Sequence, residues 1–145
     1  MRISTKGRYA LRMMLDMAQH KDEGYISLRD IAQMQNISKN YLDQIMMVMK
    51  NDRFFKTTRG YQGGYKLAKA PSEYTVGQIL RVTEGSIAPV ACLDYCGEEC
   101  TRSDNCMAMQ VWAGLEGVMQ DYLDHLTLQD ILDKYGSDPS GDIGI

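Results

Sequence analysis

The chain has 145 residues, of which 44% are hydrophobic and 24% are charged, and its formal net charge is -3 at pH 7. This length allows one domain with an accessory element and a sizeable core. No run of about 18 apolar residues offers a membrane span, and no apolar stretch of a signal peptide follows the basic N-terminus, so we expect a cytoplasmic protein with no membrane partner.

The charge is divided unevenly along the chain. Residues 1–70 carry 13 Lys and Arg against 6 Asp and Glu, whereas residues 71–145 carry 3 against 13. A surface that contacts phosphates requires an excess of positive charge, so the N-terminal half is the candidate for nucleic-acid binding. A solvated acidic tail would by itself account for about half of the asymmetry.

The N-terminal residues predict one helix. Its apolar face, at helical spacing, contains Ala10, Met13, Met14, Met17 and Ala18. Cationic residues at its start, Arg8 among them, can reach phosphates at a helix N-terminus, and a solvated helix start explains them equally well.

Two further helices joined by a tight turn follow. Ser27 with Asp30 is a helix-start signature for residues 28–35, and Ser38 can cap the second helix, in which apolar residues recur at steps of three and four. In a helix-turn-helix the second helix lies in the major groove with its N-terminal residues on base edges. The hydrogen-bonding residues on its open face are Lys39, Asn40, Asp43 and Gln44.

Residues 54–58 and 65–68 predict the strands of a β-hairpin, and residues 59–64 predict its turn. Three glycines beside Arg59 would allow a close approach to a phosphate chain, and an arginine so placed can enter a narrow minor groove. An ordinary flexible hairpin explains the turn taken alone, but the helix pair directly before it favours a wing. The sequence therefore predicts a mainly α fold with a small β-hairpin, in which residues 1–70 form a winged helix-turn-helix domain.

The second half of the chain predicts three helices. Thr75 with Gln78 is a capping box for a short helix that Gly85 ends. A heptad seam follows from Ala108, which predicts a long dimerisation helix, with intramolecular packing as the alternative. Its members are Trp112, Leu115, Met119, Tyr122 and Leu126. Residues 71–135 thus form a dimerisation segment that ends in a short helix, and residues 136–145 form a flexible tail.

All four cysteines lie in residues 92–106, as Cys92, Cys96, Cys100 and Cys106. In a cytosolic protein such clustering indicates a metal, an iron-sulfur cluster or a redox switch rather than structural disulfides. The paired CxxC motifs of structural zinc sites are absent, and iron-sulfur ligation tolerates irregular spacing. Metal or cluster binding, thiol redox sensing and inert surface cysteines all remain open on spacing alone.

Three stretches resemble the IscR/NsrR/CymR family of bacterial winged-helix transcription regulators: residues 4–10, residues 37–42 and the wing. The resemblance extends to about residue 135. It implies a homodimer on a partly palindromic operator in double-stranded DNA, with Ser38 and Tyr41 joining the open-face residues in the major groove. The wing residues that it assigns to the adjacent minor groove are Arg59, Gly60, Gln62, Gly63, Gly64 and Tyr65.

Cluster-bearing members of this family are similar in their cysteine segment, and their three ligands fall best on Cys92, Cys100 and Cys106. The IscR branch adds a histidine where this chain has Met109, and the NsrR branch adds a carboxylate where it has Arg8. Both departures leave the fourth ligand open, and Cys96 is a candidate. The CymR branch lacks the cluster cysteines.

These features together predict a dimeric transcription repressor that senses iron-sulfur, redox or nitric oxide status through a 2Fe-2S cluster. One alternative is a thiol-redox or metabolite-responsive regulator of the same family, and another is a zinc-stabilised DNA-binding protein without a cluster. We do not expect an enzyme, because no CxxC pair, nucleotide-binding loop or Ser-His-Asp arrangement is present.

Overall fold

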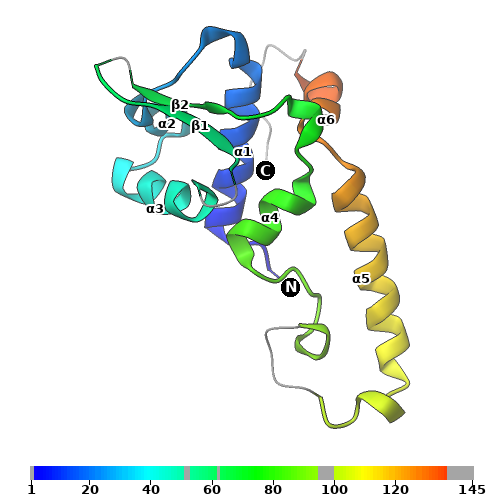
Figure 1. The fold of residues 1–145 in the computed structure, drawn as a ribbon. Helices are drawn as coiled ribbons and strands as arrows, with labels where there is room; N and C mark the ends of the chain where they lie inside the picture. The colour runs from blue at the N-terminus through cyan, green and yellow to red at the C-terminus, as the bar shows by residue number, and fades with distance from the viewer. Residues whose placement is uncertain (1, 51–52, 62, 95–99, 137–145) are drawn as a thin grey trace.

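The computed structural model describes residues 2–50, 53–61, 63–94 and 100–136. These residues form six α-helices and one two-stranded antiparallel sheet (Figure 1), which confirms the predicted mainly α fold with a small hairpin. The helices are α1 (Thr5–Gln19), α2 (Leu28–Gln35), α3 (Lys39–Lys50), α4 (Val76–Glu84), α5 (Ala108–His125) and α6 (Leu128–Tyr135), and the strands are β1 (Phe55–Thr58) and β2 (Gly64–Leu67). The predicted flexible tail lies, from residue 137 onward, outside the described residues.

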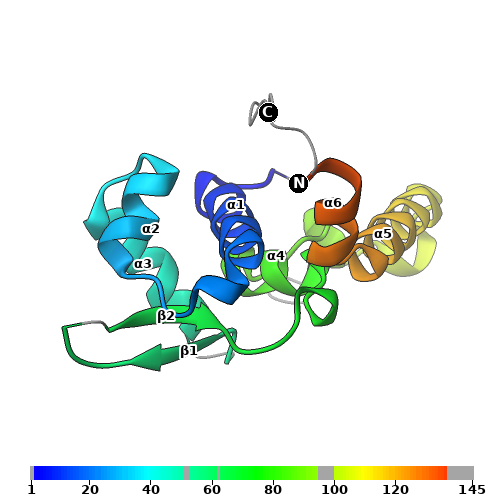
Figure 2. The same cartoon turned by 90° about the horizontal axis from the view of Figure 1, so that it is seen from above.

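Helix α1 lies at the centre of the molecule. Figure 2 shows it between the α2–α3 pair on one side and α4 and α6 on the other. Its methionine face, predicted from spacing, is buried, and Met13 and Met14 are 0% exposed. The same core includes Tyr74, Ile79 and Leu128 from the second half of the chain, so burial of one apolar helix holds both halves together.

Short-range hydrogen bonds set the helix ends. Ser27 Oγ accepts from the Asp30 backbone N–H at 3.1 Å and begins α2. Thr75 and Gln78 bond reciprocally, each backbone N–H to the other's side-chain oxygen at 3.2 Å, which begins α4. Because these signals act within one helical turn, α2 occupies residues 28–35 as the sequence predicts.

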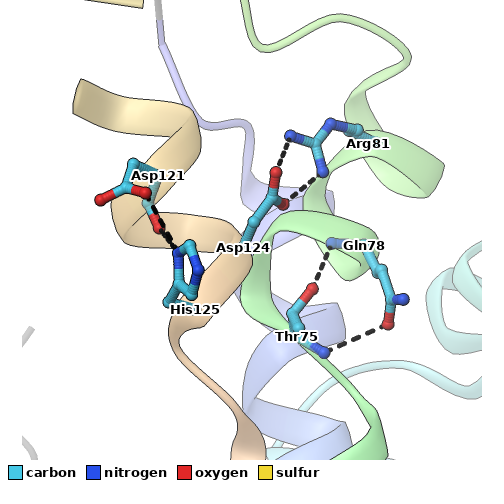
Figure 3. A network of polar contacts seen from close by, with 6 residues as sticks. All are labelled: Thr75, Gln78, Arg81, Asp121, Asp124 and His125. Atoms are coloured by element: carbon cyan, nitrogen blue, oxygen red, sulfur yellow. Dashed lines mark hydrogen bonds and ion pairs between the residues drawn. The ribbon is translucent and has the colours of Figure 1, made fainter. Parts of the chain in front are cut away.

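Helix α5 is attached to the remainder of the molecule mainly at its C-terminal end. There, Arg81 of α4 donates two hydrogen bonds to the Asp124 carboxylate, at 2.6 and 2.9 Å (Figure 3). Next to this pair, the Val76 N–H donates to the Leu126 carbonyl at 2.9 Å and the Leu128 N–H to the Tyr74 carbonyl at 3.0 Å. The bidentate geometry and the paired backbone bonds fix the orientation of α5 relative to α4.

The Arg81–Asp124 pair also makes the stability of this attachment depend on pH. The hydrogen bonds from Arg81 lower the pKa of Asp124 from its ordinary value. A lowered carboxylate pKa adds stability that is present above the pKa of the unfolded chain and is lost as the pH falls through the lower, folded value. The attachment of α5 is therefore intact at neutral pH.

The apolar residues of α5 divide between two faces. Met119 and Leu126 of the predicted seam are half-buried, and Leu126 packs beside α4. The row that faces solvent contains Met107, Val111, Leu115, Val118 and Tyr122, which are 43–90% exposed. The exposed row shares Leu115 and Tyr122 with the predicted seam, and Trp112 of that seam, which lies beside the row, is 37% exposed. None of the helices in the described ranges is both long and apolar enough to cross a membrane.

We predict that Gly77 is required by the Arg81–Asp124 pair. A Cβ at Gly77 would overlap the Asp124 carboxylate, so Gly77→Ala should displace that carboxylate from Arg81 and remove an exposed ion pair that contributes at most about 1 kcal/mol to the free energy of unfolding. In an Asp124→Ala background the same substitution should be neutral or stabilising by up to about 1 kcal/mol, because alanine favours helix more than glycine. Urea unfolding at one protein concentration measures both; equal losses in the two backgrounds would contradict the assignment.

Candidate nucleic-acid interface and cysteine segment

The first half of α3 presents a polar surface to solvent. Ser38 begins the helix, because its hydroxyl accepts a hydrogen bond from the Tyr41 backbone N–H at 3.2 Å. The inner face of α3 is filled by core residues that are at most 3% exposed, namely Leu42, Ile45, Met46 and Met49. Packing of that face leaves Ser38, Lys39, Asn40 and Gln44 exposed.

Two of the predicted contact residues on α3 are partly engaged by neighbours. The Asp43 carboxylate lies 3.9 Å from Lys39 Nζ, an exposed pair worth at most about 1 kcal/mol, which a DNA contact can readily replace. Tyr41 is half-buried and packs edge-on against Tyr9, with ring centroids 6.0 Å apart. Tyr41 therefore has a structural contact in addition to any contact with DNA.

The start of α1 lies beside the start of α3. The Tyr9–Tyr41 contact joins the two helices, and the Arg12 guanidinium lies 5.2 Å from the centre of the Tyr9 ring. Arg8 is exposed and donates a hydrogen bond to Thr5 Oγ1 at 3.1 Å. These cations therefore lie beside the start of α3, within the half of the chain that has a positive net charge.

The hairpin tip lies on the same side of the molecule as α2 and α3, away from α5 (Figures 1 and 2). Arg59 and Gly60 are exposed there. Tyr65 is half-buried and meets the Phe55 ring edge-on. Gln62, which was also predicted to contact DNA, lies outside the described residues.

The hairpin is anchored by a residue that the sequence analysis did not identify. Ile26, before α2, pairs with Tyr65 through two backbone hydrogen bonds of 2.9 and 2.8 Å. Gly64 is buried at this junction, and a Cβ there would overlap the Ile26 carbonyl oxygen. Gly64 thus lets the backbones of β2 and residue 26 approach closely, whereas the sequence suggested only an approach to phosphate.

Helical spacing places one more residue, Met47, on the open face of α3, in addition to the predicted contact residues. Met47 follows Asp43 by four residues and Gln44 by three, which places it on the same open face. It is 72% exposed. The face toward the candidate ligand therefore includes one large apolar side chain.

The structure brings the described cysteines toward one another. Cys92 is exposed, Cys100 and Cys106 are half-buried, and none of the three forms a disulfide. The pKa of the Cys92 thiol is raised, first because it shares a hydrogen bond with Cys100 and then because of the charges of Cys100 and Cys106. The three cysteines predicted as ligands thus share one neighbourhood.

Thiolates are the ligands that an iron-sulfur cluster requires, so the chemistry of the three described cysteines fits such a group. Their arrangement is not yet that of a formed site, since no three His, Cys, Asp or Glu side chains in the described ranges stand close enough to hold a metal ion. Cys96 lies outside the described residues. Met109, half-buried in the first turn of α5, offers only a thioether.

Comparison with known proteins gives a consistent result. The sequence model of the Rrf2 family, described as an iron-dependent transcriptional regulator, matches residues 3–134. The regulator CymR of Bacillus subtilis is 39% identical over 131 residues, which cover 90% of this chain and 89% of CymR; its solved structure gives a TM-score of 0.70 over 92% of this chain and 98% of that one.

The regulator IscR of Pectobacterium carotovorum is 34% identical over 134 residues, which cover 92% of this chain and 80% of IscR. The solved structure of T. potens IscR is 36% identical and gives a TM-score of 0.71, over 92% of this chain and 88% of that one. Both named relatives are thus transcriptional regulators.

Proposed function

Because the chain belongs to the Rrf2 family of transcriptional regulators, we propose that it acts in the cytoplasm by binding an operator in double-stranded DNA through α3 and the hairpin. Its relatives are regulators and not enzymes. The observation that carries the proposal is the arrangement of exposed polar residues on α3 and exposed Arg59 on one side of the molecule, within the positively charged half of the chain.

The residue types on α3 suit the major groove. The amides of Asn40 and Gln44 can pair with adenine, Lys39 with guanine, and the Asp43 carboxylate with the amino group of cytosine. Arg8 is placed to contact phosphates, and Arg59 at the hairpin tip to enter the adjacent minor groove. Base contacts from α3 would then set sequence preference, while the arginines supply affinity.

We predict that Arg59→Ala weakens binding to an operator selected from random DNA by roughly 1–3 kcal/mol, because a positive charge in the minor groove is lost. The matched control is Lys21→Ala. Lys21 carries the same charge but lies beside Gln129 and Asp133 of α6, away from the hairpin. Fluorescence anisotropy at several salt concentrations measures both variants. Equal affinities for wild type and Arg59→Ala would exclude a role for the hairpin tip.

We further propose that two chains associate through the exposed apolar row of α5. No residue of the described ranges covers its large side chains, whereas the neighbouring face of α5 packs beside α4. An exposed apolar stripe of this kind is typical of a helix that pairs with a copy of itself. In a dimer, two α3 helices about 34 Å apart would meet successive major grooves of a palindromic operator.

Val118→Asp should produce a monomer, because it places a charge in the centre of the proposed contact. Val118 is 70% exposed, so the substitution removes little packing among the described residues. Ala113→Asp, on an exposed position that points to another side of α5, is the control and should leave the dimer intact. Sedimentation equilibrium measures the mass of each, and a monomeric wild type at micromolar concentration would contradict the proposal.

For the signal, we propose that Cys92, Cys100 and Cys106 hold a 2Fe-2S cluster, with Cys96 as the candidate fourth ligand, and that the protein is a repressor. Support comes from the three neighbouring thiols and from the iron-dependent character of the family. The cluster would supply a redox-sensitive group. Cys92 lies after α4, and Cys106 lies two residues before the start of α5, so ligand bonds among these thiols would connect the segments that follow α4 and precede α5.

A thiol switch is the second candidate. The Cys92 and Cys100 thiols interact with each other, and loss of two electrons and two protons to an oxidant such as a peroxide would join them in a disulfide. A zinc site would use the same thiolates without redox chemistry. The three possibilities differ in colour, in metal content and in mass.

Anaerobic reconstitution with iron and sulfide should give visible absorbance and two irons per chain. Cys92→Ala, Cys100→Ala and Cys106→Ala should each abolish both signals, and Cys96→Ala tests the fourth ligand. Wild-type protein that stays colourless and iron-free would overturn the cluster. In that case a loss of two hydrogen masses after peroxide treatment would favour the disulfide, and bound zinc would favour the structural site.

A further inference from the structure

Met47 occupies the middle of the open face of α3. It lies seven residues, about two turns, beyond Asn40, and so projects in nearly the same direction. With about 100° per residue, its direction falls between those of Asp43 and Gln44. Its 72% exposure therefore places an apolar side chain within the surface that we propose to face DNA.

Packing among the described residues gives no reason for methionine at this position. The core beneath α3 is already filled by Leu42, Ile45 and Met49, which are all 0% exposed. Met47 is also remote from the exposed row of α5, because α3 and α5 lie at opposite sides of the molecule in Figures 1 and 2. Its apolar surface is thus exposed in the free protein and is not continuous with the proposed dimer contact.

The major groove offers one apolar group that a methionine can recognise, the C5-methyl of thymine. The methionine side chain is flexible and polarisable, and its sulfur is only a weak hydrogen-bond acceptor. Building on the proposed DNA-binding function, we propose that Met47 is a specificity-determining residue that contacts a thymine methyl group in each half of the operator.

Helix geometry places that thymine relative to the other contacts. Met47 lies three residues beyond Gln44, or about 4.5 Å along the axis, and base pairs are about 3.4 Å apart. The thymine should therefore lie within about two base pairs of the base that Gln44 meets. Apolar recognition at this place makes the operator preference of this chain depend on a methyl group as well as on hydrogen bonds.

The test replaces each operator thymine in turn with deoxyuridine, which lacks only the methyl group. The expected result is one position in each half-site where the replacement weakens binding about fourfold, the equivalent of one buried methyl group. Met47→Ala should bind the thymine and deoxyuridine operators equally well. Met34→Ala changes a methionine of α2 that is 41% exposed, and as the control it should keep the wild-type discrimination.

The outcomes separate the inference from the function on which it rests. Tight operator binding by wild type with no sensitive thymine, or unchanged discrimination in Met47→Ala, would overturn the role of Met47 and leave DNA binding intact. Absence of DNA binding by wild type at low salt would overturn the proposed function and this inference with it. A melting temperature of Met47→Ala equal to that of wild type excludes misfolding as the cause of any change.

Discussion

The attachment of α5 to α4 is the constraint on which the arrangement of the molecule depends. It is made at one end, by the bidentate Arg81–Asp124 pair and by backbone bonds between the starts of α4 and α6. One bond at the end of a long helix would leave the direction of that helix undefined. Two charge-assisted bonds and two backbone bonds together specify it. Gly77 is the sequence feature that makes the close approach possible. The outward apolar row of α5 therefore has a defined orientation relative to α3.

The buried methionines of α1 give the molecule its common core. Met13, Met14 and Met17 contribute to one cluster that also contains residues of α3, α4 and α6. Methionine fills irregular space between helices that cross at different angles, because its unbranched side chain adapts. One central helix can thus pack against neighbours on several sides. The winged helix and the segment that follows it consequently share one core.

The sequence predicted features that depend on neighbours within one turn. Helix α2 has its predicted bounds because Ser27 and Asp30 determine its start locally. The dimer seam on α5 stays a prediction, since helical periodicity identifies apolar residues but not which of them a neighbouring helix covers. Pairing of Ile26 with Tyr65 joins positions far apart in the chain and has no local signal. Of the site, the polar face of α3 was predictable, whereas the contact between Cys92 and Cys100 required the fold.

Helix α4 connects the two ends of the molecule. It packs against α1 and α3, which border the proposed DNA surface, and against α5, which carries the proposed dimer contact. Ser4, the first residue before α1, donates through its hydroxyl to the Glu84 carboxylate at the end of α4, at 2.7 Å. The cysteine segment begins shortly after that point and ends at α5. A change in the bonding of the thiols would therefore act on the two helices that relate the proposed DNA surface to the proposed dimer contact.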